Sequence, residues 1–528
     1  MDKLRRQILF SSIAGLGLSA VGRPLQARVR PRLIAADLAN VRQYGAKGDG
    51  VTIDSPAINR AIDAAASRGG GTVYFPAGTY ASYTIRLKSN VTLYLDQGAI
   101  LLAASTPREG LASGGYDAAE YQDPAIDSFQ DYGHNHWKNS LVYGEGLHDI
   151  AILGEGRIWG KGLSRGHDFD ADLPLTNRPG VGNKAIALKN CYNVQLRDFQ
   201  ILQGGWFAVL ATAVDNLTID NLIVDTNRDG FDIDCCRNVH VTNCIVNSPW
   251  DDGICPKSSF ALGYARSTEN VTIANCTVSG SYVVGSVLDG TFRRLSSDQQ
   301  PYATGRIKCG TESNGGFKNI TITNCTFDHS RGIALETVDG ANLEDITISN
   351  IAMRGSCNSP LFLRLGRRMR GPKGTPVGTL KRILINNITS SASVALPSII
   401  AGVEGYPVED VQISDLYLEQ VGGMTHVPGL APKNEDQYPE PTMFGDLPAT
   451  GFFIRQARNI EMHHIEVACQ APDARPAYWL EDVDGFEGFS LKTPGSHAFN
   501  LTRVSAFGVS GSRQFSDRVY SSVVSETF

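Results

Sequence analysis

The sequence predicts an all-β fold, a parallel β-helix, from a recurring motif, a spacing near 22 residues and a turn-rich composition. The motif reads Asn, apolar, any, apolar, any, Asn or Asp, any, any, apolar. Its clean copies begin at Asn193, Asn216, Asn238, Asn270 and Asn319. The first three starting points lie 23 and 22 residues apart. A repeat of this length, built from short β-type segments, is typical of a solenoid in which each repeat forms one coil.

The repeat continues in weaker copies that start at Asp345, Arg382, Asp410 and Asn459. Leucine-rich repeats have a similar period, but their leucine–asparagine signature is missing, and each unit offers strands without a helix. The coils of a β-helix stack about 4.8 Å apart. Asparagines at equivalent turns can bond their own backbone or form a ladder from coil to coil.

The N-terminus has the features of an export leader. Lys3, Arg5 and Arg6 precede 14 mostly apolar residues, 8–21, and a small-residue cleavage site lies near Ala27. Fourteen residues are short for a membrane span, which needs about 20. The arginine pair suggests twin-arginine export, and an ordinary secretory signal remains open. We therefore expect residues 1–27 to be a signal, and the protein to be periplasmic or extracellular in a bacterium.

A short amphipathic helix is expected before the repeats, with Ser55 as its N-cap and Pro56 at its first position. Its apolar face has helical spacing: Ile58, Ala61, Ile62 and Ala65. The glycines of 69–71 end it. Such a helix covers the open first coil of a solenoid.

Residues 28–528 are predicted to form a single catalytic domain, because no shift in composition marks a second one. Three stretches interrupt the repeats, 105–140, 281–305 and 422–450, and insertions in solenoids often form loops on the binding face. The net charge of −6 gives no basic field for nucleic acid. We expect a monomer that binds neither nucleic acid nor a membrane.

The cysteines are interpreted as core residues instead of disulfide partners. Cys244, Cys276 and Cys325 each follow an asparagine in the same slot of the repeat, where residues stack from coil to coil. No cluster of cysteine and histidine has metal-ligand spacing, and no glycine-rich loop has the pattern that cradles phosphate. No metal and no cofactor are expected.

Three carboxylates stand out, Asp229, Asp251 and Asp252, separated by 22 and 23 residues. This spacing predicts adjacent coils. Consecutive residues of a regular strand point to opposite faces, so the chain must bend for both Asp251 and Asp252 to face one groove, and Pro249 and Gly253 favour a bend. Carboxylates this close repel, so one should retain its proton, as acid/base hydrolysis of glycosides requires.

A basic pair follows the acids. Arg306 and Lys308 alternate, so both face one side of a strand. They follow Asp251 by 55 and 57 residues, which predicts a position about two coils on, roughly 10 Å along the groove. There they could bind a substrate carboxylate. Lys257 is a further candidate, with an ordinary solvated charge as the alternative.

Other polar residues of this region have less specific patterns. Turn chemistry accounts for Asp225, Asp232 and Asp234. Four more could line the same cleft, from later coils or from the first insertion: Glu312, Glu336, His134 and His136.

These motifs resemble glycoside hydrolase family 28, the polygalacturonases and related pectin hydrolases. The family shows Asn-Thr-Asp, Asp-Asp, Gly-His-Gly and Arg-Ile-Lys in this order. The chain has Asn-Arg-Asp at 227–229, Asp-Asp at 251–252 and Arg-Ile-Lys at 306–308. The segments 44–50 and 69–80 are also similar, and the resemblance covers about residues 41 to 390.

The resemblance implies a right-handed β-helix and an inverting mechanism. It implies that Asp251 is the general acid, that Asp229 and Asp252 activate the attacking water, and that Arg306 and Lys308 bind the carboxylate of a uronic acid. Side-chain directions, which spacing does not supply, decide between inversion and retention.

The chain departs from the family pattern twice. Arg228 replaces the threonine, and no Gly-His-Gly occurs in 279–294. The histidine is also absent from the branches that cut rhamnogalacturonan, so both pectic backbones remain open as substrates. Asn227, Arg228 and Lys257 are further candidates for substrate binding.

The sequence thus predicts a hydrolase of acidic pectic polysaccharide, acting at chain ends because long insertions tend to close a groove. Two alternatives remain open. One is a polysaccharide lyase, with calcium held by the three aspartates and Arg306 as base. The other is a carbohydrate-binding β-helix without catalysis.

Overall fold

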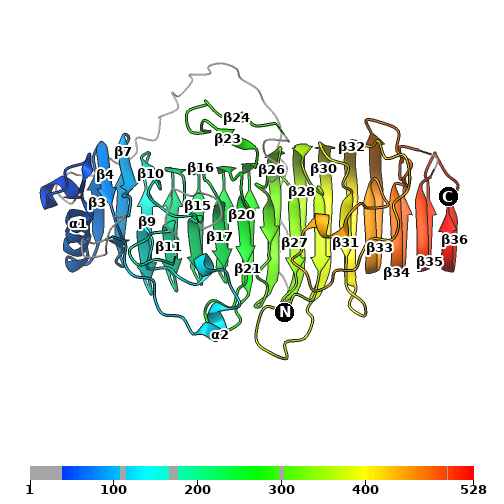
Figure 1. Ribbon diagram of the computed structural model, residues 1–528, viewed down its shortest axis with the longest axis horizontal. Helices are drawn as coiled ribbons and strands as arrows, with labels where there is room; N and C mark the ends of the chain where they lie inside the picture. The colour runs from blue at the N-terminus through cyan, green and yellow to red at the C-terminus, as the bar shows by residue number, and fades with distance from the viewer. Residues whose placement is uncertain (1–37, 107–114, 166–176, 297–302, 496) are drawn as a thin grey trace, which may run out of the picture. The chain divides into compact units, whose positions relative to one another are not determined.

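Three parallel sheets wind around one continuous core in the computed structural model (Figure 1). The structure describes residues 38–106, 115–165, 177–296, 303–495 and 497–528. Ala39–Phe528 form one compact unit. The predicted parallel β-helix is confirmed, whereas the proposed export leader lies outside the described residues. Among the helices that the structure describes, none is long and apolar enough to cross a membrane.

One sheet, the ladder face, contains strands that pair in parallel from coil to coil. They are β3 (Gly71–Phe75), β6 (Val91–Leu95), β9 (His148–Leu153), β12 (Tyr192–Arg197), β15 (Asp215–Asp220), β18 (Arg237–Thr242), β21 (Thr268–Ala274), β26 (Phe317–Asp328), β28 (Asn342–Ser356), β30 (Thr379–Ala392), β32 (Val408–Gln420), β33 (Phe452–Cys469), β34 (Tyr478–Phe489) and β35 (Phe499–Ser510). The last strand, β36 (Arg518–Thr527), is antiparallel to β35.

The second sheet has short strands: β2 (Asp49–Ile53), β4 (Gly78–Ser82), β7 (Ala99–Ala103), β10 (Arg157–Trp159), β13 (Gln200–Leu202), β16 (Ile223–Asp225), β19 (Ile245–Asn247) and β22 (Thr277–Ser279). The third sheet, the groove face, has β5 (Ile85–Arg86), β8 (Val142–Glu145), β11 (Lys184–Lys189), β14 (Phe207–Thr212), β17 (Asp229–Asp234), β20 (Ile254–Lys257), β25 (Ile307–Cys309), β27 (Ile333–Thr337), β29 (Leu361–Leu365) and β31 (Ser398–Ala401). β33 closes the groove face by pairing with β31.

The remaining elements lie outside these sheets or at their start: β1 (Leu38–Asn40), β23 (Tyr282–Val284), β24 (Arg293–Arg294), and the helices η2 (Val41–Tyr44), α1 (Ser55–Ser67), α2 (Pro124–Asp127), η4 (Tyr132–His134) and η5 (Pro441–Phe444). The strands β23 and β24 form an antiparallel hairpin between β22 and β25. The insertions that the sequence predicted thus contain α2, η4, this hairpin and η5.

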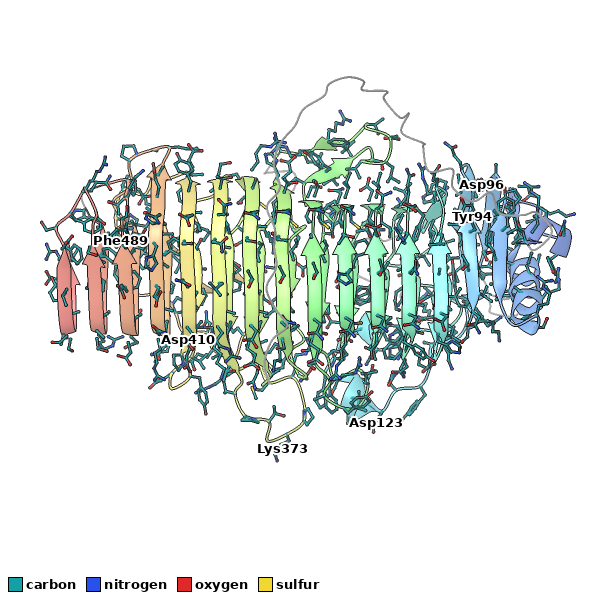
Figure 2. All side chains as sticks on the ribbon, turned by 180° about the vertical axis from the view of Figure 1, so that it is seen from behind. Tyr94, Asp96, Asp123, Lys373, Asp410 and Phe489 are labelled. Atoms are coloured by element: carbon teal, nitrogen blue, oxygen red, sulfur yellow. The ribbon has the colours of Figure 1, made fainter. Side chains whose placement is uncertain are left out.

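The asparagine ladder predicted from the repeat is confirmed. Asn216 donates to Asn193 at 2.9 Å, Asn238 to Asn216 at 3.1 Å and Asn270 to Asn238 at 3.0 Å. Each of these asparagines has a positive φ near 55°, the left-handed conformation that asparagine tolerates better than most residues. The same contact recurs in the C-terminal coils, where Asn459 donates to Asp410, a residue labelled in Figure 2.

The predicted capping helix is α1, with its apolar face buried against the first coils. The predicted N-cap was one residue off. Asp54 occupies the cap position and Ser55 is already helical. Asp54 accepts hydrogen bonds from the backbone N–H groups of Lys47 and Gly48, so its side chain fixes the preceding turn instead of capping the helix. The sequence pattern of helix N-caps does not include hydrogen bonds to the preceding turn, so it did not predict this role of Asp54.

All ten cysteines are free, as the repeat pattern predicted, and eight of them are buried. Cys244, Cys276 and Cys325 lie in the central core, each about 1% exposed. Their slot directly follows a second row of asparagines, Asn243, Asn275 and Asn324, and points inward, so small apolar side chains stack there from coil to coil.

Two insertions cover the outer side of the groove face, each over a small apolar cluster. The N-terminal cluster packs Trp137 of the first insertion on Trp206, Phe207 and Leu210. The C-terminal cluster consists of side chains from the 422–450 insertion and the last strands of the face, among them Ala431, Phe444, Leu447, Phe453 and Trp479. The outward-facing side chains between these two clusters form the candidate site.

Candidate active site

The structure brings the three aspartates together on adjacent coils. Asp229 begins β17, and Asp251 and Asp252 lie in irregular backbone just before β20. The N–H of Gly230 donates to the carbonyl of Asp252 at 2.9 Å, which aligns the two coils. The Ser248 hydroxyl lies 2.7 Å from the carbonyl oxygen of Asp251 and so fixes the bend. The irregular backbone lets two consecutive carboxylates serve one site.

Asp252 is held between two cations. Its Oδ1 lies 2.5 Å from Nε of Arg306, and its Oδ2 lies 2.5 Å from Nζ of Lys308. Burial opposes ionisation of Asp252, but Arg306 and Lys308 outweigh it and lower the pKa of this carboxyl. The predicted separation of roughly 10 Å was wrong. Ile254 of β20 pairs directly with Ile307 of β25, so the intervening insertion adds a loop to the coil and no extra coil.

The surroundings shift the pKa values of Asp229 and Asp251 in opposite directions. Burial raises the pKa of Asp229 well above its ordinary value, and the charge on Asp251 adds to this effect. Burial also disfavours ionisation of Asp251, but Arg228 and Lys308 outweigh it and hold its pKa well below the ordinary range. A hydrogen bond from Asp229 contributes in the same direction. Burial and the neighbouring charges thus favour a proton on Asp229 and a negative charge on Asp251.

Arg228, which replaces the family threonine, lies directly against the acids. Its Nε is 3.2 Å from Oδ2 of Asp251 and 3.6 Å from Oδ1 of Asp229. Its guanidinium stacks over the Trp206 ring at 4.1 Å. The predicted neighbour Asn227 does something different, because its side-chain oxygen accepts from the N–H of Gly205 at 3.2 Å and so shapes the turn.

A second buried cluster lies beside the aspartates. Nζ of Lys257 is 3.0 Å from Oε2 of Glu312 and 3.9 Å from Oδ2 of Asp232, so this lysine neutralises neighbouring acids. His134 reaches the cluster from the first insertion, with Nε2 at 3.6 Å from Asp232 and 3.7 Å from Glu312. Burial lowers the pKa of His134 to about 4. The interpretation of Asp232 as a turn residue was wrong, because it faces this cluster.

The other polar predictions differ in outcome. Asp225 accepts from Asn247 at 2.8 Å, and Asp234 accepts from the hydroxyl of Ser259 at 2.6 Å, so both have the structural role expected of them. His136 does not enter the cluster, because its ring stacks on a tyrosine of the same insertion.

The 422–450 insertion contributes residues that sequence reasoning missed. Oε2 of Glu440 is 3.2 Å from Nη1 of Arg306, and its Oε1 is 3.2 Å from Nη1 of Arg331. The hydroxyl of Tyr438 is 3.5 Å from Nζ of Lys308. Neither residue belongs to a repeat, so no spacing in the sequence connects them with the acids.

Glu336, one coil beyond the basic pair, is a buried carboxyl with a proton near neutrality. It is 0% exposed, it accepts from the Thr311 hydroxyl at 3.1 Å, and its Oε1 lies 3.9 Å from Arg306. Burial raises the pKa of Glu336 to about 7, against the opposing effect of Lys308 and Arg306. Glu336 lies beside the basic pair, but its side chain is buried and does not line an open cleft as the sequence suggested.

Replacing Glu336 by glutamine is expected to change how stability depends on pH. Because the folded protein holds this proton more tightly than the unfolded chain, stability falls as pH rises from about 4.5 to about 7, by up to ~3 kcal/mol, and is flat above. Glu336→Gln should remove that decline and raise the melting temperature at pH 8. Thermal unfolding between pH 4 and 8 measures it, with the exposed Glu487→Gln as control. Parallel curves for Glu336→Gln and the unaltered protein would contradict the assignment.

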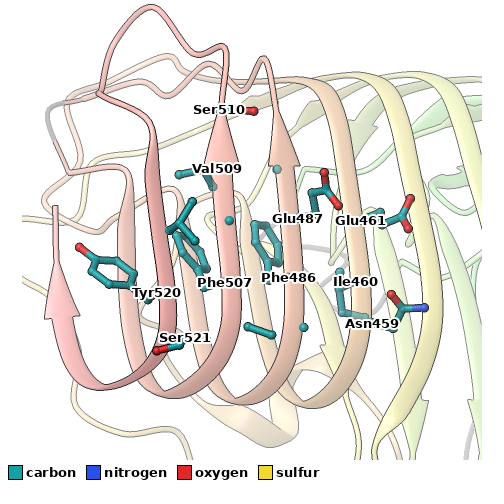
Figure 3. A pocket seen from close by; sticks show the side chains of 15 residues that line it. Asn459, Ile460, Glu461, Phe486, Glu487, Phe507, Val509, Ser510, Tyr520 and Ser521 are labelled. Atoms are coloured by element: carbon teal, nitrogen blue, oxygen red, sulfur yellow. The ribbon is translucent and has the colours of Figure 1, made fainter.

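A hollow on the last coils offers no comparable chemistry. It lies between β33 and β36 and is lined by backbone, aromatic rings and two glutamates, Glu461 and Glu487 (Figure 3). No buried pair of carboxylates and no basic pair occurs among its lining residues. The site on the groove face is therefore the stronger candidate.

Comparisons with known proteins agree with the fold. A family model described as rhamnogalacturonase A/epimerase, pectate lyase-like, matches residues 38–138, and one described as a right-handed β-helix region matches 175–297. The solved structure of the family 28 exopolygalacturonase of Yersinia enterocolitica is similar with a TM-score of 0.58 and 18% identity, covering 85% of this chain and 78% of that one. At this identity the likeness supports the fold, including its predicted right hand.

Two curated relatives extend the comparison to sequence. A probable polygalacturonase of Vitis vinifera is 24% identical over 361 residues, 60% of this chain and 70% of the relative. An exo-poly-α-D-galacturonosidase of Dickeya chrysanthemi is 35% identical over 286 residues, 44% of this chain and 43% of the relative. The chain thus spans less than half of the second relative. The resemblance predicted from the motifs is confirmed: the chain is similar in sequence to polygalacturonases and in fold to a family 28 exopolygalacturonase.

Proposed function

We propose that the protein hydrolyses glycosidic bonds of a galacturonan-type pectic polymer, from the chain end and with inversion. The observation that carries this proposal is the set of three carboxylates in contrasting protonation states against Arg306 and Lys308. Such a set can supply a proton to a leaving oxygen, a base for water and cations for an acidic sugar.

Asp251 is assigned as the general acid because its side chain remains 29% exposed, whereas those of Asp229 and Asp252 are 4% and 1% exposed. The proton shared with Asp229 passes to Asp251 and then to the leaving oxygen. Asp252 and the deprotonated Asp229 accept the proton of a water that attacks the anomeric carbon from the opposite face. The released chain takes the acid's proton, and exchange with solvent restores the pair.

The charge around the basic pair favours an acidic sugar. Arg306, Lys308 and Arg331 provide three positive charges. Asp252 and Glu440 oppose them with two negative charges, and burial, which raises the pKa of Glu336 to about 7, keeps that carboxyl mostly protonated only below this pH. The excess positive charge can bind the carboxylate of a uronic acid by charge-assisted hydrogen bonds.

The covering insertions support action at chain ends. The N-terminal cluster, with Trp137, covers the groove face on one side of the acids. The C-terminal cluster, with Phe444, covers it on the other side. Between them the side chains of Asp229, Asp252, Arg306 and Lys308 are at most 4% exposed. A polymer that cannot run along the whole face has to enter by one end.

The place of action follows from the substrate. A pectic polymer belongs to plant cell walls, outside the bacterial cytoplasm, so this function requires export. The positively charged, then apolar, segment 1–27 supports that part of the proposal.

Time-resolved NMR of digests of polygalacturonan, rhamnogalacturonan and short oligogalacturonides tests the proposal. We expect small uronic acid products from the earliest time points, with the anomeric configuration inverted before mutarotation. Early products of intermediate length would refute chain-end action, and retained configuration would refute inversion.

Three further outcomes would overturn or change the proposal. An unsaturated uronate that absorbs in the ultraviolet would identify a lyase. No release of reducing ends from any of the three substrates would reject the substrate class, and preference for rhamnogalacturonan would move it to that backbone.

A further inference from the structure

A group of three buried side chains beside the acids has the composition of a metal site. His134, Asp229 and Asp232 each offer one ligand atom, and these atoms all lie within 4.8 Å of one another. The three residues are 4%, 3% and 0% exposed. His134 comes from the first insertion, 95 residues before Asp229, which is why no spacing in the sequence predicted the group.

The atoms of this group lack hydrogen-bond partners within the described protein. Both ring nitrogens of His134, Oδ1 of Asp229 and both carboxylate oxygens of Asp232 make none. The nearest contacts of His134 Nε2, at 3.6 and 3.7 Å, are longer than hydrogen bonds. Buried polar atoms are nearly always paired, so unpaired atoms on three side chains whose ligand atoms lie within 4.8 Å of one another indicate a bound ligand.

We propose that His134, Asp229 and Asp232 bind one divalent transition-metal ion, and that Zn²⁺ fits them best. Ligands about 2.1 Å from a tetrahedral zinc ion stand ~3.4 Å apart. Nε2 of His134 and Oδ2 of Asp232 are 3.6 Å apart, close to that separation. One imidazole nitrogen with two carboxylates favours zinc or cobalt over magnesium and calcium, which prefer oxygen ligands alone.

The neighbouring cations leave room for the ion because each is bound more closely elsewhere. Nζ of Lys257 is 3.9 Å from Asp232 but 3.0 Å from Glu312. Nε of Arg228 is 3.6 Å from Asp229 but 3.2 Å from Asp251. Their positive charge weakens the affinity for a dication without occupying its ligands.

The inference does not rest on the proposed hydrolysis, since metal binding is measured without substrate. The two would interact through Asp229. A zinc ion bound there occupies a carboxylate that the hydrolysis requires, so zinc is expected to inhibit the enzyme.

Calorimetric titration of the chelator-treated, dialysed full-length protein with Zn²⁺ tests the site. We expect one ion per chain, and at least tenfold weaker binding after His134→Ala or Asp232→Asn. Co²⁺ should give the visible absorption bands of a four-coordinate ion. His136→Gln is the matched control. His136 lies in the same insertion and is also buried, but it stacks on Tyr132 at 4.0 Å and bonds the carbonyl of that residue at 2.9 Å.

Several results would overturn the proposal. They are no binding of Zn²⁺ or Co²⁺ up to millimolar concentration, unchanged affinity in His134→Ala, and equal weakening by His136→Gln. Circular dichroism and thermal unfolding establish that each variant is folded. If His134→Ala does not fold, Asp232→Asn decides the outcome, because asparagine keeps the size of the side chain and removes a charged ligand.

Discussion

Replacing Asp251 by asparagine is expected to lower kcat on a pectic substrate by roughly 10³-fold, within the range for removal of a general acid. Asparagine keeps the shape of the side chain, so KM should change little. The proton on Asp229 remains, but its route to the leaving oxygen is lost. The pKa of Asp229 should also fall, because the charge on Asp251 is one of the causes that raise it. Initial rates of reducing-end release measure the effect.

The matched control for this substitution is Asp415→Asn, an exposed aspartate on the ladder face of the C-terminal coils. It should leave kcat unchanged. Activity of Asp251→Asn within tenfold of the unaltered protein would remove Asp251 from the mechanism and favour a binding β-helix without catalysis. A large loss with a strongly raised KM would assign Asp251 to substrate binding instead.

Replacing Arg306 by alanine is expected to destabilise the protein by about 3–5 kcal/mol and to raise KM for acidic oligosaccharides at least 100-fold. Removing one partner of a buried ion pair is costly, and Asp252, 2.5 Å from the guanidinium, would keep only Lys308 as a compensating charge. Glu440, at 3.2 Å, loses the same partner. Denaturant unfolding and steady-state kinetics measure the two effects separately.

Arg382→Ala provides the control for the loss of a charge alone. Arg382 also pairs with two acids, Asp345 at 2.7 Å and Glu344 at 2.6 Å, but its side chain is 44% exposed. Exposed pairs contribute at most about 1 kcal/mol, so this variant should be nearly as stable as the unaltered protein. If the two substitutions lowered the free energy of unfolding equally, burial would not make the ion pairs of Arg306 more stabilising than the exposed pairs of Arg382.

The replacement of the family threonine by Arg228 changes the electrostatics of the acids. Arg228 lies closer to Asp251 than to Asp229, so it favours the charge on Asp251 and leaves the proton on Asp229. The resemblance implies a proton on Asp251. Both statements agree if the proton moves along the Asp229–Asp251 hydrogen bond when substrate binds, and the position of the proton in the free protein is then a property of this particular chain.

Several features could be predicted from the sequence because they depend on local repetition. Asn193 and Asn216 stack because each stands at the same place in its coil, and the 22-residue interval from Asp229 to Asp251 is one coil long. The alternation of Arg306 and Lys308 also predicted correctly that both would face one side. The period of the coil places the asparagines and the acids on neighbouring coils, and the two-residue period of a strand places the basic pair on one face.

Which side chains contact the aspartates of the candidate active site was decided only by the tertiary structure. His134 and Glu440 come from insertions whose paths no period constrains, and the contact of Arg306 with Asp252 depended on whether an insertion adds a coil or a loop. The sequence predicted that one carboxyl retains its proton but not which one, because burial, the largest cause that shifts the pKa of Asp229 and of Glu336, exists only after the covering segments have folded over the groove face. The sequence by itself determined the β-helix and the candidate acids, whereas the packing of the insertions determined their charge states and their partners.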